Sequence, residues 1–293
     1  MSDIPQICDY EGSNYRTDFW EGHGRDYEDQ VERSVLRRWL PPKGKRVLEI
    51  GAGFGRLTNE FKGFQQVVVL DYSFSQLQYA REHYGDAGFV YVAADAYNLP
   101  FQVGVFDAAT MIRVIHHFAN VPLVLQGIRR TLAPRAMFIL EYANKRNLKA
   151  MLRYALRQQD WNPYTLDPVE FVKLNFDFHP QYIEQALNQN GFHTQKRVPV
   201  SYLRLGLLKK TLPTSVLVAL DSVLQKTGLL YSPSIFTLNQ TDNSGTDQTA
   251  LDDIFACPKT GAPLVRVGNL MVNEQAGVRY EIRDGIYIFK DLD

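Results

Sequence analysis

The stretch that decides the fold is Val47-Leu48-Glu49-Ile50-Gly51-Ala52-Gly53-Phe54-Gly55. Its first four residues are apolar apart from one acid, which predicts a buried strand of a parallel sheet. The three glycines predict a loop with almost no side chains, and we expect a helix to begin near Arg56. A strand that passes through glycines into a helix N-terminus lets backbone N–H groups approach a ligand closely.

The glycine spacing separates two kinds of ligand-binding loop. A dinucleotide fingerprint, G-x-G-x-x-G, would place its third glycine at position 56, where this chain has Arg56. The glycines stand instead at 51, 53 and 55, and Glu49 lies two residues before the first of them. A nicotinamide oxidoreductase is therefore disfavoured, whereas a tight strand-to-helix turn of another doubly wound protein stays open.

Acids follow the next two expected strands. Asp71 ends the run at 67–70 and lies close to the ~20 residues expected between a glycine loop and a ribose-binding acid. Its alternative role is to cap the helix expected over 74–84, although Ser73 is an equally good cap. Asp95 follows the strand expected at 89–93, and taken alone it is a turn residue that satisfies its own backbone.

In this order, the features resemble the motifs of the class I S-adenosylmethionine-dependent methyltransferases, with acid-x-Gly-x-Gly-x-Gly as motif I. The run Val114-Ile115-His116-His117-Phe118 is similar to the ubiquinone- and menaquinone-biosynthesis-like subgroup. The resemblance covers about residues 47–145 and implies S-adenosyl-L-methionine as the cofactor. It says little about the acceptor.

The resemblance also implies which residues bind the cofactor: Glu49, Gly51, Ala52, Gly53, Gly55, Asp71, Tyr72, Asp95, Ala96 and Arg113. Asp71 would accept hydrogen bonds from both ribose hydroxyls, and Asp95 would accept one from the adenine amino group. In the subgroup the segment before the core folds over the cofactor, so Tyr15, Trp20 and Arg25 are further candidates. The alternative is a helix that only packs on the sheet edge.

A base is needed only if the acceptor must lose a proton before it takes the methyl group. His116 and His117 are the candidate catalytic bases, because the resemblance places them beside the methyl end and a histidine pKa near ~6.5 suits neutral pH. His117 is the better match, and Glu141 is a weaker alternative. The histidines could otherwise end a strand and cap the following helix.

We expect an α/β fold: a Rossmann-like, doubly wound, mostly parallel seven-stranded sheet with helical insertions, followed by a small β-rich domain. The last strand, near 234–238, is expected to insert antiparallel between two others. The expected divisions are a helical lid segment at 1–45, a core at 46–238 with insertions near 144–178 and 205–230, a linker at 239–253, and a C-terminal domain at 254–293.

The two insertions are apolar and aromatic, and by the family's topology they would roof the substrate pocket. They favour a small hydrophobic or aromatic acceptor. Helices that extend the core or make a dimer contact are one alternative, and contact with a lipid surface through Arg204, Lys209 and Lys210 is another.

Parts of the C-terminal stretch, Cys257-Pro258 and residues 280–286, resemble the small activator protein of tRNA and release-factor methyltransferases. The zinc-binding members carry paired cysteines, but Thr260 occupies the partner position here, so no metal site is expected. We expect this tail to dock on its own core, with an independent β module as the alternative. The tail also keeps open a tRNA or protein acceptor. A non-catalytic cofactor-binding scaffold is a separate alternative, because binding alone would preserve Glu49, Asp71 and Asp95.

The composition limits which classes of function remain possible. The chain has 293 residues with 32 basic and 32 acidic side chains, and this zero net charge disfavours nucleic-acid binding. No apolar leader and no membrane-spanning run are visible in the sequence. Its two cysteines, Cys8 and Cys257, have no metal-ligand spacing, and we expect a cytoplasmic protein with reduced thiols.

Overall fold

The computed structural model describes residues 7–13, 16–20 and 24–290. Its central strands are β1 (Gly44–Ile50), β2 (Phe64–Asp71), β3 (Phe89–Ala93), β4 (Phe106–Met111), β5 (Leu132–Ala143), β8 (Phe192–Val200) and β9 (Ser234–Thr241). The helices beside them are α1 (Asp26–Trp39), α2 (Phe74–Tyr84), α3 (Val121–Thr131) and α5 (Pro180–Gln189). The alternation of strands and helices agrees with the expected Rossmann-like methyltransferase fold.

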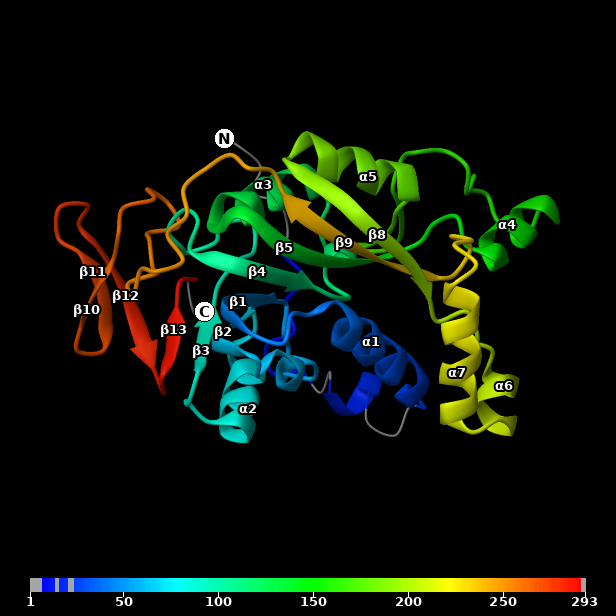
Figure 1. Ribbon diagram of the computed structural model, residues 1–293, viewed down its shortest axis with the longest axis horizontal. Coiled ribbons are helices and arrows are strands. Elements are labelled where there is room, and N and C mark those ends of the chain that lie inside the picture. The colour runs from blue at the N-terminus through cyan, green and yellow to red at the C-terminus, as the bar shows by residue number, and fades with distance from the viewer. Residues whose placement is uncertain (1–6, 14–15, 21–23, 291–293) are drawn as a thin grey trace.

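The central strands lie in the order β3-β2-β1-β4-β5-β9-β8 (Figure 1). The first five are parallel, whereas β9 pairs antiparallel with both β5 and β8. The predicted antiparallel insertion of the last strand is therefore confirmed. This strand runs to Thr241, beyond the expected end at 238, because its polar side chains bond to β5: Asn239 donates to the Phe138 carbonyl and Thr241 to the Ala133 carbonyl.

Helices cover both faces of the sheet, as Figure 1 shows with α3 and α5 on one side and α1 and α2 on the other. Successive strand residues point to opposite faces. Leu48 and Val68 pack in the apolar cluster that contains α3 and α5, while Val47 and Val67 pack in the cluster that contains α1 and α2. The continuous apolar runs that predicted buried parallel strands arise from this two-sided cover.

The seven-stranded sheet is the central part of a larger mixed sheet. The C-terminal strands β10 (Val265–Val267), β11 (Leu270–Asn273), β12 (Val278–Arg283) and β13 (Ile286–Ile288) extend it past β3. β13 pairs with β3 in parallel, and the Phe255 ring stacks on Phe101. The single strand expected over 279–289 is divided, because Asp284 and Gly285 form a turn with φ of 48° and 71°.

The first insertion was expected to be helical, but it is only partly so. It contains α4 (Leu148–Ala155) and a hairpin of β6 (Val169–Val172) and β7 (Asn175–Asp177). Valine and phenylalanine in β6 favour a strand, and Leu174 adopts a positive φ of 54° in the turn that follows.

The second insertion forms α6 (Gly206–Thr211) and α7 (Thr214–Gln225). It packs on α1, where the Tyr27 hydroxyl donates to Asp221 at 2.7 Å and Lys209 pairs with Glu28 at 2.9 Å. Its expected place over the substrate pocket is therefore wrong.

The segment expected to be a linker is anchored to the core. Gln248 N–H donates to the Gly104 carbonyl at 2.9 Å, and Arg46 donates to the Leu251 carbonyl at 2.8 Å. Within the described ranges, no helix is both long and apolar enough to cross a membrane.

Candidate active site

The glycine loop begins where β1 ends and lies against β2. The N–H groups of Gly51 and Ala52 both donate to the Leu70 carbonyl, at 2.8 and 3.0 Å. Gly51 has a φ of 70°, and a Cβ there would lie 2.2 Å from a methyl group of Val114, so no side chain fits. Gly53 also has a positive φ, but its missing Cβ would meet nothing within 4 Å. The space above Gly53 is therefore open to a ligand.

Gly55 has a packing role, and the α-helix expected at Arg56 is absent. A Cβ on Gly55 would lie 2.8 Å from the Tyr84 ring, and the Gly55 carbonyl accepts the Tyr84 hydroxyl. The Arg56 carbonyl, which would accept an N–H in an α-helix, accepts a hydrogen bond from Arg33 instead. Only a short 3₁₀ turn, η2 (Thr58–Phe61), follows.

The ends of β1, β2, β3 and β4 surround one cavity, which encloses about 720 Å³ including open solvent at its mouth. Gly51, Asp71 and Asp95 all line it, as expected for residues that follow the carboxyl ends of parallel strands. Its other lining residues are Ile7, Cys8, Tyr10, Ile50, Gly53, Leu70, Tyr72, Gln76, Ala94, Ala96, Arg113, Val114, His117 and Phe118.

Asp71 is oriented by the backbone around it. Its carboxylate accepts N–H groups from Gly53 at 2.7 Å and from Ser73 at 2.8 Å. Ser73, not Asp71, caps α2 through a bond from the Gln76 N–H. A carboxylate has about four acceptor positions, so two remain for ligand hydroxyls. Burial raises the pKa of Asp71, and the backbone N–H groups oppose that rise.

Asp95 both satisfies its turn and faces the cavity. Its two oxygens accept the Tyr97 N–H at 2.8 Å and the Asn98 amide at 3.0 Å. Burial raises the pKa of this carboxyl. The turn role that the sequence offered as an alternative is thus present, and it holds Asp95 and Ala96 at the cavity wall.

His117 also lines this cavity and lies in the turn η3 (Ile115–His117). Its Nδ1 is 2.9 Å from the Leu174 carbonyl, which can only accept, so Nδ1 carries the proton. Its Nε2 then has a free electron pair and lies 3.5 Å from the Tyr10 hydroxyl. Burial lowers the pKa of His117, so the ring is neutral at pH 7.

His116 and Glu141 line neither this cavity nor the smaller one beside the glycine loop. His116 Nδ1 is buried and without a hydrogen-bond partner, and burial lowers its pKa well below the usual value. The Glu141 carboxylate accepts the Arg113 N–H at 2.8 Å and the Ser234 hydroxyl. Glu141 therefore supports the backbone of Arg113, which has a positive φ of 60°.

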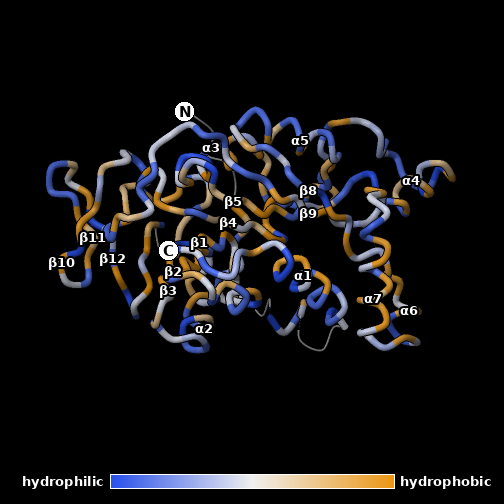
Figure 2. Tube along the Cα trace, in the orientation of Figure 1, coloured by the Kyte–Doolittle hydropathy of each residue, from blue (hydrophilic) through white to orange (hydrophobic). Residues whose placement is uncertain are grey.

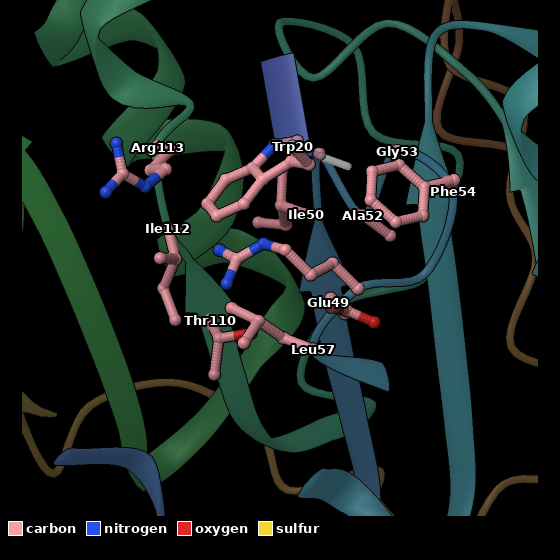
Figure 3. Close-up of a pocket in the computed structure, with 12 residues that line it drawn as sticks. Trp20, Glu49, Ile50, Ala52, Gly53, Phe54, Leu57, Thr110, Ile112 and Arg113 are labelled. Carbon is pink, nitrogen blue, oxygen red and sulfur yellow. The ribbon is translucent and has the colours of Figure 1, made fainter. Parts of the chain in front are cut away.

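A second, smaller cavity of about 460 Å³ adjoins the glycine loop on the side of β4. Figure 3 shows Trp20, Glu49 and Arg113 around it. Glu49 is almost fully buried and accepts the Thr58 hydroxyl at 2.5 Å. Burial raises the pKa of Glu49 to about 8, so most of this carboxyl is protonated at neutral pH.

Charged residues from α1 hold the loops around this smaller cavity. Glu32 is fully buried and pairs with Arg56 at 2.6 Å and with Arg113 at 2.5 Å. Trp20 covers the pair, since the Arg56 guanidinium lies 3.8 Å from the Trp20 ring centre. The two arginines lower the pKa of Glu32 against the effect of burial. In the sequence, Arg56 only argues against a dinucleotide-binding loop. In the structure, it also joins α1 to the glycine loop.

The N-terminal segment covers part of the site, both through the lid candidate Trp20 and through residues that the sequence did not single out as site residues. Ile7, Cys8 and Tyr10 line the larger cavity, and Trp20 lines the smaller one. Arg25 lies 5.6 Å over the Trp20 ring and lines neither cavity, and Tyr15 falls outside the described residues. No local pattern marks Cys8 or Tyr10.

The C-terminal tail reaches the cavity wall at Tyr72. The Lys290 ammonium lies 4.0 Å from the centre of the Tyr72 ring and 3.7 Å from Glu11. Glu11 in turn accepts the N–H groups of Phe74 and Ser75 at the start of α2. Among the residues described, no group of three His, Cys, Asp or Glu side chains is placed to hold a metal ion.

Part of the chain is similar in sequence to known methyltransferases. Residues 48–140 match the family described as "Methyltransferase domain". An O-methyltransferase of Penicillium expansum is 29% identical over 46% of this chain and 52% of its own, so the chain spans about half of that relative. A 2-phytyl-1,4-naphtoquinone methyltransferase of Nostoc punctiforme is 26% identical over 62% of this chain and 86% of its own.

A solved S-adenosylmethionine-dependent methyltransferase of Mesorhizobium loti shares the fold. Its TM-score is 0.52 at 16% identity, and the match covers 73% of this chain and 99% of that one. The matches support a class I S-adenosylmethionine-dependent methyltransferase and imply S-adenosyl-L-methionine as the cofactor. The larger cavity fits this group, since it combines the open space at Gly53 with two strand-end acids.

Proposed function

We propose that this chain transfers a methyl group from S-adenosyl-L-methionine to a small hydrophobic or aromatic acceptor. One observation carries the proposal: a single cavity is lined both by the strand-end acids Asp71 and Asp95 and by His117, whose Nδ1 donates to the Leu174 carbonyl and leaves Nε2 unprotonated. Quinone-type and O-methyltransferase relatives support the acceptor class.

In this proposal the protein binds and aligns two reactants. When bound, the cofactor supplies an electrophilic methyl group on a positively charged sulfur. The acids Asp71 and Asp95 would accept hydrogen bonds from the ribose hydroxyls and the adenine amino group, respectively. The glycine loop would let the amino-acid end of the cofactor approach the backbone closely. Phe118 and Leu70 provide apolar walls of the cavity. Alignment of the two reactants is the main source of rate in such a displacement.

His117 acts on the acceptor. Its Nδ1 proton is held by the Leu174 carbonyl, so Nε2 takes the proton that an acceptor O–H, N–H or acidic C–H loses as the new bond to carbon forms. Because burial lowers its pKa, His117 is already in the neutral form that can accept a proton at pH 7. Tyr10, at 3.5 Å from Nε2, lies where an acceptor would approach.

The test is transfer of a labelled methyl group. Purified full-length protein is incubated with S-adenosyl-L-methionine labelled on the methyl carbon, together with a cell extract separated into small molecules, lipids, protein and RNA. We expect label in the small-molecule or lipid-soluble fraction, and none with Asp71→Ala. Label confined to protein or RNA would contradict the acceptor class, and no label in any fraction would favour a non-catalytic scaffold.

We also propose that residues 254–293 stabilise the core on which they dock, which their resemblance to a small activator protein first suggested. Support comes from the β13–β3 pairing and from the Lys290 contact with Tyr72. Deleting 254–293 should lower the melting temperature and weaken cofactor binding. Unchanged stability and affinity would make the tail an independent module.

A further inference from the structure

One end of the molecule exposes aliphatic side chains in two helical stripes. On α4 and its C-terminal cap, Leu148, Leu152 and Leu156 are 64%, 58% and 57% exposed. Their spacing of four residues places them on one face of the helix. On α6 and α7, Leu207, Leu220 and Val223 are 74%, 46% and 62% exposed. Exposed apolar groups are ordinary when scattered, but aligned stripes of this kind mark a contact surface.

The two stripes belong to the same end of the molecule. Figure 1 shows α4, α6 and α7 at one end of the long axis, and Figure 2 shows apolar residues along α7. The backbone joins them, because the Leu148 N–H donates to the Tyr231 carbonyl at 2.9 Å and the Asn144 side chain donates to the Leu230 carbonyl at 3.1 Å. Both stripes thus belong to the same end of the molecule, which we call the aliphatic end.

Positive charges accompany the stripes. Lys149, Arg153 and Arg157 each follow one leucine of α4 by one residue and are exposed, and residues 148–159 contain no acid. On the second insertion Lys210 and Lys226 are exposed, while its one acid, Asp221, is buried and accepts the Tyr27 hydroxyl. The acids nearest in sequence, Asp160, Asp167 and Glu170, follow the α4 stripe. In a chain of zero net charge, these helices are locally cationic.

We infer that the aliphatic end docks on the surface of an anionic lipid bilayer. A helix with an apolar stripe and flanking lysines and arginines lies in the membrane interface, with its apolar side chains among the acyl chains and its cations near the headgroups. The charge asymmetry favours a bilayer over an uncharged apolar partner. The inference goes beyond the proposed reaction, since bilayer binding needs neither cofactor nor turnover.

Co-sedimentation with large unilamellar vesicles tests the inference on the full-length protein without cofactor. Vesicles of phosphatidylcholine alone are compared with vesicles that also contain phosphatidylglycerol, at low and high salt. We expect sedimentation with the anionic vesicles that weakens as salt screens the cations. Replacing all three leucines, Leu148→Ser, Leu152→Ser and Leu156→Ser, should weaken partitioning about tenfold or more.

A matched control uses the opposite end of the sheet, where Val265 and Val267 are 58% and 59% exposed. Val265→Ser with Val267→Ser should leave partitioning unchanged. Both sets of variants should keep the wild-type melting temperature, because the replaced side chains are exposed. No partitioning of the wild-type protein, or equal partitioning of the leucine variant, would overturn the inference. A wild-type dimer that the leucine variant dissociates would also overturn it, because a second copy would then cover this surface.

Discussion

On the proposed cofactor side of the cavity, Gly51, Asp71 and Asp95 each follow a parallel strand, and each is held by hydrogen bonds to nearby or paired backbone. On the proposed acceptor side, His117 contacts Tyr10 and Leu174, which come from distant parts of the chain. The comparison teaches that the cofactor side is a property of the sheet, whereas the acceptor side depends on how separate segments pack. The two sides should therefore fail differently when they are mutated.

The largest effect is expected at Glu32, which ties α1 to the loops of both sides. Glu32→Ala leaves Arg56 and Arg113 without their buried partner, and we expect a loss of about 3–5 kcal/mol in the free energy of unfolding. Urea denaturation measures it. The surface pair Glu184–Arg197 is the control, where Glu184→Ala should cost at most about 1 kcal/mol. Equal losses in the two variants would show that the buried network does not hold the site.

The second effect separates the two sides kinetically. His117→Ala removes the proposed base and should lower turnover about 100-fold, within the usual range for a general base, while the Kd for S-adenosyl-L-methionine stays at the wild-type value. Steady-state kinetics and calorimetry measure the two quantities. His193→Ala, an exposed histidine on β8, is the control. A parallel loss of cofactor affinity would place His117 on the cofactor side and remove it from proton transfer.

The third effect separates the packing role of Gly55 from the cofactor-binding role proposed for the rest of the glycine loop. Gly55→Ala forces a Cβ against Tyr84 and should cost about 1–3 kcal/mol of stability without changing cofactor affinity in the folded protein. Gly268→Ala also has a positive φ but an open environment, so the difference in thermal stability between the two variants isolates the Tyr84 contact. If Gly55→Ala instead weakens cofactor binding at full stability, the packing role assigned to Gly55 is wrong.

The smallest effect is a pH dependence from Glu49. Its pKa is raised from 4.5 to about 8 on folding, so the folded state binds more protons than the unfolded state between these values, and stability falls as pH rises through this window. From pH 6.5 to 8.5 we expect the wild type to lose about 1–2 kcal/mol relative to Glu49→Gln. Thermal melts of both proteins across this range measure it, and parallel pH profiles would mean that Glu49 is ionised in the fold.

The elements that the sequence predicted well are those encoded locally. Apolar runs predicted the five parallel strands, and the glycine and acid spacing predicted which residues would meet at their ends. Ser73 is one of two possible caps of α2 in the sequence, and its hydroxyl accepts the Gln76 N–H. Strand ends converge whatever the side chains elsewhere do, because the sheet order fixes them.

The features that were missed depend on contacts between distant segments. Glu32 is one acid among several on α1, and only packing selects it as the partner of Arg56 and Arg113. Lys290 reaches Tyr72 because β13 joins the sheet beside β3. A 3₁₀ turn stands where a helix was expected after Arg56, and the Arg56 carbonyl accepts a hydrogen bond from Arg33. No spacing or periodicity in the sequence predicts any of these contacts.

The most direct test of the central claim is calorimetric titration of S-adenosyl-L-methionine and of NAD into the wild type, Asp71→Ala and Asp86→Ala. Asp71 can offer two charge-assisted hydrogen bonds to ribose hydroxyls, whereas Asp86 pairs with Arg81 on the surface. We predict that S-adenosyl-L-methionine binds the wild type and Asp86→Ala equally, that it binds Asp71→Ala about 100-fold more weakly, and that NAD does not bind. Binding of NAD in place of S-adenosyl-L-methionine, or full affinity in Asp71→Ala, would contradict the assignment of this cavity.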